Sequence, residues 1–213
     1  MFLTRQSGLR GSLIVLFVGL CVAFTMVIGL YLAGFDAVAA LRDRNLSDAP
    51  EAGLISDLGI LVMAFAGVTA AIEAWRSANL PLGILALFCW LFALDDALRI
   101  HEAFGPLESA IFALYGLLAA LALFLFRKPG APLTWPIIVA IAAFAFSVSI
   151  DVLWVWLVEN LQTPVQTKHL LHRIGIVLED VPKFGGILVL SSFAIGEAFL
   201  VRGIRKSMRL RSQ

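Results

Sequence analysis

The residues best suited to chemistry lie together in residues 169–183 of the sequence. A helix advances about 100° per residue, so five ionisable side chains of this segment fall within an arc of roughly 100°. An apolar run, Phe184 to Ile195, follows them directly. We therefore expect one ionisable helix face to continue into a membrane. Its members are His169, His172, Glu179, Asp180 and Lys183.

The composition of the whole chain favours the same environment. Of the 213 residues, 61% are hydrophobic and 15% are charged, and the mean hydropathy is +0.95. Soluble domains carry about 25% charged residues. The net charge is +1, and no basic stripe lies outside the membrane flanks, so the sequence gives no case for nucleic-acid binding. The lipid bilayer is therefore the expected partner of this protein.

Six stretches are apolar and long enough to cross a bilayer, which takes about 20 helical residues. The predicted fold class is all-α, a polytopic integral membrane protein with six transmembrane helices in one domain. More lysines and arginines flank the spans on the side of the N-terminus than on the other side. We therefore expect both termini in the cytoplasm and the protein in a bacterial inner membrane. The predicted spans are about residues 12–33, 54–75, 81–104, 107–126, 134–157 and 170–201 of a single domain, residues 1–213.

Successive spans cross the membrane in opposite directions. This places most intramembrane acids near the outer face, at the level of the three histidines. A charged group in hydrocarbon costs several kcal/mol unless it is paired or hydrated. The acids at this level outnumber the bases, so we expect protons, a cation or water to offset the excess. The acids are Asp57, Asp95, Asp96, Glu102, Asp151, Glu179 and Asp180, and the bases are Arg99, Arg173 and Lys183.

Imidazole nitrogens beside carboxylate oxygens form the kind of ligand set that zinc and iron accept. We therefore predict one or two divalent metal ions, zinc or iron, whose bound water would act as a nucleophile. On an ideal helix His101 projects opposite Asp95, so it joins this site only if the third span turns near its end. The predicted metal ligands are His101, Glu102, His169, His172 and Glu179. The predicted catalytic residues are Asp95, Asp96, Asp151, Asp180 and Lys183.

A simpler interpretation of the same residues is structural. Histidines at the ends of spans often lie with their polar tip in the headgroup layer. Asp95 with Arg99, and Glu179 with Lys183, have the i,i+4 spacing of ion pairs within one helix. At the opposite end of the spans, Glu73 and Glu197 are expected to be solvated.

Three classes of function remain open. The first is a metal-dependent membrane enzyme that acts on a lipid or another apolar substrate. The second is a proton- or cation-coupled transporter or channel that uses the intramembrane carboxylates. The third is an accessory subunit in which two histidines ligate a haem, with Arg99 and Lys183 near its propionates. Transport requires polar residues that continue across the membrane, and the inner half of the predicted spans offers few beyond Thr69, Glu73 and Glu197.

Overall fold

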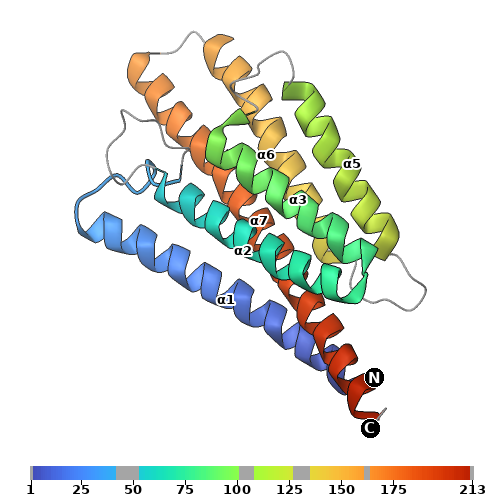
Figure 1. Cartoon of the computed structure of the whole chain (residues 1–213). Helices are drawn as coiled ribbons and strands as arrows, with labels where there is room; N and C mark the ends of the chain where they lie inside the picture. The colour runs from blue at the N-terminus through green and yellow to red at the C-terminus, as the bar shows by residue number, and fades with distance from the viewer. Residues whose placement is uncertain (1, 42–52, 101–107, 127–134, 161–163, 212–213) are drawn as a thin grey trace.

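The computed structural model describes residues 2–41, 53–100, 108–126, 135–160 and 164–211. These residues form long helices and no strand, as the all-α prediction requires. Figure 1 shows them as one elongated bundle. The helices are α1 (Phe2–Leu32), α2 (Leu54–Ser77), α3 (Leu80–Leu98), α5 (Glu108–Phe126), α6 (Trp135–Asn160) and α7 (Val165–Arg211).

Several of these helices are long and apolar enough to cross a membrane. Four meet this condition over their described residues: Ser12–Leu32, Leu54–Ser77, Leu80–Leu98 and Val165–Leu210. Shorter apolar segments occupy α5 and α6, at Ala110–Phe126 and Trp135–Ile150. The apolar part of α1 carries exposed large side chains along its length, including Phe17 and Tyr31. Such a surface suits contact with lipid.

Helix α3 is shorter than the predicted third span. Its last helical residue is Leu98, and Arg99 adopts a left-handed conformation with φ of 51°. The backbone N–H of Arg99 donates to the carbonyl of Asp95, which is a common way to end a helix. The predicted third span continues to residue 104, and residues 101–104 lie outside the described residues.

Helix α7 runs through the middle of the bundle and contacts α1, α2, α3 and α6. It has 47 residues and continues through Pro182 without ending. Gly59 of α2 faces Ile187, and Ser191 donates to the sulfur of Met63 at 3.5 Å. Because both sequence numbers rise together along these contacts, α2 and α7 are parallel.

Small residues allow the neighbouring helices to approach α7 closely. Gly175 leaves room for the indole of Trp154, whose Nε1 donates to the carbonyl of Leu171 at 2.8 Å. Gly186, later in α7, lies against Phe144, which comes earlier in α6 than Trp154. These contacts run in opposite directions along the two helices, so α6 is antiparallel to α7 and fixes the rotation of α7 about its axis.

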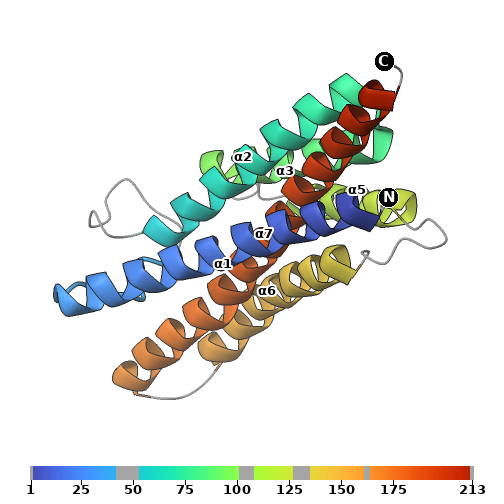
Figure 2. The ribbon, with the colours of Figure 1, turned by 90° about the horizontal axis from the view of Figure 1, so that it is seen from below.

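The two ends of the bundle differ in what they contain. The first residues of α1, the last of α7 and the turn between α2 and α3 lie at one end (Figures 1 and 2). The C-terminal end of α3 and the N-terminal half of α7 point toward the other end. We call the first end the terminal end and the second the opposite end.

Candidate functional site

A buried ion pair joins α3 to α7. Lys183 Nζ lies 2.6 Å from Asp96 Oδ1, and the two side chains are 16% and 4% exposed. A charged hydrogen bond of this length is among the stronger polar contacts of a protein interior. The pair forms because α3 reaches α7 just before it ends at Leu98. It joins two residues that are 87 positions apart in the sequence.

The pair lies beside a small cavity that contains a second acid. Asp96, Asp180, Lys183 and Ser56 supply its polar lining, and we call these four residues the acid–lysine cluster. Asp180 is itself buried. The cavity has a volume of about 10 Å³, close to the space that one water molecule needs. The remaining lining is apolar and comes from Leu41, Ile55, Phe184 and Ile187.

Asp95, the neighbour of Asp96, faces a different helix. Consecutive helical residues point about 100° apart, so the two carboxylates diverge. Asp95 is buried and lies beside the hydroxyl of Tyr115 in α5, and this hydroxyl donates to the carbonyl of Leu91 at 3.4 Å. The Asp95–Asp96 dipeptide therefore connects α5 to α7 through α3.

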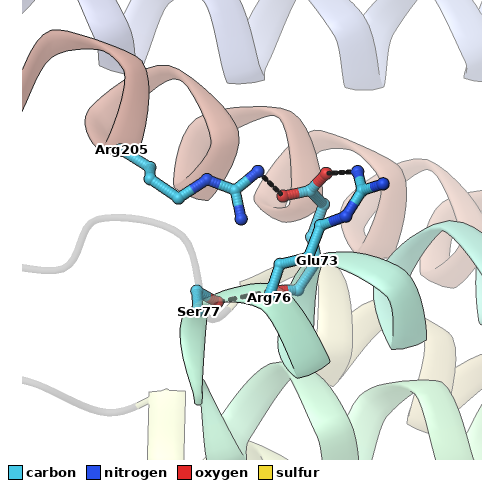
Figure 3. Close-up of polar contacts among 4 residues, drawn as sticks. All are labelled: Glu73, Arg76, Ser77 and Arg205. Atoms are coloured by element: carbon cyan, nitrogen blue, oxygen red, sulfur yellow. Dashed lines mark hydrogen bonds and ion pairs between the residues drawn. The ribbon is translucent and has the colours of Figure 1, made fainter. Parts of the chain in front are cut away.

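Another buried carboxylate, Glu73 of α2, lies at the terminal end of the bundle (Figure 3). Its Oε2 is 3.1 Å from Arg205 Nη2 of α7, and its Oε1 is 3.3 Å from Arg76 Nη1. The Glu73 side chain is 6% exposed, whereas Arg205 and Arg76 are 28% and 55% exposed. Ser77 donates its hydroxyl to the carbonyl oxygen of Glu73. We call Glu73, Arg76 and Arg205 the arginine clamp.

The prediction that Glu73 is solvated was wrong, and the sequence contains a signal that contradicts it. Four residues of α2 are spaced by three, four and three positions, and all four are buried in the structure: Met63, Ala66, Ala70 and Glu73. This spacing is typical of the face that a helix buries. Glu73 continues this buried face by one further turn, where it meets α7.

The two histidines of α7 lie away from the acid–lysine cluster. Both His169 and His172 are exposed. His172 precedes Lys183 by 11 residues, which is about 16 Å along a helix. Glu179 lies between them and is half-buried. One metal ion therefore cannot bind His172 and the buried end of the cluster together in this arrangement.

The other predicted site residues are only partly accounted for. His101 and Glu102 lie outside the described residues, as does the side chain of Asp151, although its backbone belongs to α6. Among the residues that the structure does describe, no three His, Cys, Asp or Glu side chains come together as a metal site. The metal site stays a prediction. Asp95, Asp96, Asp180 and Lys183 are the predicted residues that the fold brings into its interior.

The chain belongs to the family described as "Domain of unknown function (DUF8692)", whose model matches residues 13–195. No curated protein and no solved structure matches the chain. The matched residues include the whole acid–lysine cluster and Glu73, and they end before Arg205.

Proposed function

We propose that the protein is a transporter or channel that moves protons across a bacterial inner membrane, with the acid–lysine cluster as its proton-binding site. Six spans with both termini in the cytoplasm are part of this proposal. The observation that carries it is the buried contact of Lys183 with Asp96, with Asp180 beside the same cavity. Ionisable residues that face the interior of a membrane bundle commonly belong to ion or proton pathways.

The chemistry of the pair supports a proton as the bound ion. A lysine can release its proton when its surroundings change, and an aspartate can accept one. Transfer of the proton from Lys183 to Asp96 converts two buried charges into two neutral groups, so the pair can exist in either form. The cavity has room for about one water molecule, which would connect the pair to Asp180.

The position of Glu73 adds support for transport. On α7, Lys183 and Arg205 are 22 residues apart, or about 33 Å along a helix. The hydrocarbon core of a bilayer is about 30 Å thick. Buried ionisable groups therefore lie toward each end of the predicted spans. The metal-dependent enzyme receives less support, because His169 and His172 are exposed and distant from the buried acids.

The proposal can be tested by proton flux into liposomes that contain the purified protein. A potassium gradient with valinomycin sets a negative interior potential, and a trapped pH-sensitive dye reports proton entry. We expect flux above that of empty liposomes, and its loss in Asp96→Asn. Lys183→Arg should also lose flux while the protein stays folded, because arginine keeps the positive charge but does not release its proton.

Asp36→Asn is the matched control for these variants. Asp36 contacts Arg173 at 2.8 Å, and both side chains are about half exposed, so this ion pair lies outside the cluster. Its removal should leave the flux unchanged. Wild-type flux equal to that of empty liposomes, or equal flux in wild type and Asp96→Asn, would overturn the proposal.

A further inference from the structure

An apolar groove runs along the outside of the bundle between α2 and α3. Its volume is about 690 Å³, within the usual range for sites that bind small molecules. Small side chains form its floor, including Ala71 and Ala74 of α2 and Gly83 and Ala86 of α3. Trp75 and Trp90 also line it and are exposed, so the groove opens to the surroundings of the bundle.

The length of the groove matches one leaflet of a bilayer. It begins at the turn between α2 and α3, where Ala78 and Asn79 line it, and extends along α3 to Trp90. Asn79 and Trp90 are 11 residues apart, which corresponds to about 16 Å along a helix. Half of the hydrocarbon core is about 15 Å thick. An acyl chain in this groove would reach from the membrane surface to the middle of the bilayer.

The groove starts at the positively charged end of the molecule. The terminal end carries Arg76 and, on α7, Arg202, Arg205, Lys206 and Arg209, while Glu73 supplies a negative charge beside them. Asn79 lies in this turn and caps the start of α3 by accepting from the Leu82 N–H at 3.1 Å. Basic groups at the membrane surface attract anionic lipids.

We infer that this groove binds one acyl chain of an anionic phospholipid whose phosphate lies at the turn between α2 and α3. An acyl chain fits the apolar floor, and the exposed Trp75 would lie near the headgroup level, where tryptophan is favoured. The inference requires that α2 and α3 span a bilayer, and it does not depend on proton transport.

Native mass spectrometry of the detergent-purified full chain tests the inference. Phosphatidylglycerol or phosphatidylcholine of the same chain length is added, and the lipid retained by each protomer is counted. We expect one phosphatidylglycerol to be retained at concentrations at which phosphatidylcholine is not. Gly83→Leu should abolish this retention by filling the groove. An added Cβ at Gly83 makes ordinary contact with Ala74, so the backbone itself tolerates a side chain.

Gly116→Leu is the matched control, because an added Cβ at Gly116 of α5 meets nothing within 4 Å. It should retain phosphatidylglycerol as the wild type does. Ala71→Leu repeats the test from the α2 side if Gly83→Leu fails to fold. Equal retention of both lipids, or retention that survives both groove variants, would overturn the inference. A dimer that dissociates in Gly83→Leu would also overturn it, because a second copy of the chain would then occupy the groove.

Discussion

The acid–lysine cluster and the arginine clamp both neutralise a buried carboxylate, but with different kinds of base. At the cluster, Asp96 contacts Lys183, and both side chains are largely removed from solvent. At the clamp, Glu73 is as buried as Asp96, but its two arginines extend to the surface. An arginine stays charged in proteins, whereas a lysine can release its proton.

This difference assigns the two regions different roles. The clamp holds fixed charges and connects the end of α2 to α7, so it is suited to fixing how these helices lie against each other. The cluster holds charges that a proton transfer can neutralise within the bundle. Two buried acids on the same helix bundle are therefore not equivalent, and the base that contacts each acid determines what it can do.

The largest expected effect on stability comes from removing one partner of the cluster. Lys183→Met removes the cation that contacts the buried Asp96, and we expect a loss of about 3–5 kcal/mol of folding stability. The double variant Asp96→Asn with Lys183→Met should recover most of this loss, because neither charge of the ion pair remains. Thermal unfolding in detergent measures both. A single variant as stable as the wild type would contradict the buried contact.

A smaller loss is expected at the clamp. Glu73→Gln removes the buried charge, while Arg205 and Arg76 keep access to water, so we expect about 1–2 kcal/mol. The same unfolding experiment applies, with Arg205→Gln as the companion variant. If Glu73→Gln lowered the folding stability as much as Lys183→Met, the arginine clamp and the acid–lysine cluster would not differ in the way proposed here.

A weaker effect still is expected at the hydroxyl that connects α5 to Asp95. Tyr115→Phe keeps the ring, which packs against Phe88 and Phe92, and removes the hydroxyl that donates to Leu91 and lies beside Asp95. We expect a loss of about 1 kcal/mol. If Tyr115→Phe unfolded at the same temperature as the wild type, this hydroxyl would not stabilise the bundle.

The smallest change in stability is expected at the exposed histidines, where the metal hypothesis is tested. In metal-free protein, His172→Ala should change the unfolding free energy by less than about 0.5 kcal/mol, as is usual for exposed positions. The sequence predicts about one or two equivalents of zinc or iron in protein purified without chelator or a histidine tag. Elemental analysis should show that His172→Ala loses this metal.

Elemental analysis of Asp96→Asn tests whether His172 and the acid–lysine cluster are separate. If metal binds through His172, it should be retained in Asp96→Asn, because the two positions are too far apart to share one ion. Loss of metal in both variants would mean that the histidines and the acid–lysine cluster come together, which would contradict their separation in this structure.

Local sequence determined much of the architecture. Long apolar segments predicted helices, and described helices begin close to expected boundaries, such as Leu54 for α2 and Leu80 for α3. The sequence also identified Asp95, Asp96, Asp180 and Lys183 as residues that belong in the interior, because a charged group in an apolar segment needs a partner. These conclusions depend on composition and periodicity over a few helical turns, which the chain specifies by itself.

Tertiary structure decided which of these residues meet. Spacing suggested Lys183 as a partner for Glu179, four residues away, and only the fold shows that Lys183 also contacts Asp96 on another helix. It also buries Glu73 against Arg205, a contact across 132 positions that no local pattern contains. Such contacts depend on the rotation and offset of one helix against another. Close approaches at Gly59, Gly175 and Gly186 set these quantities, and they become defined only when the helices pack.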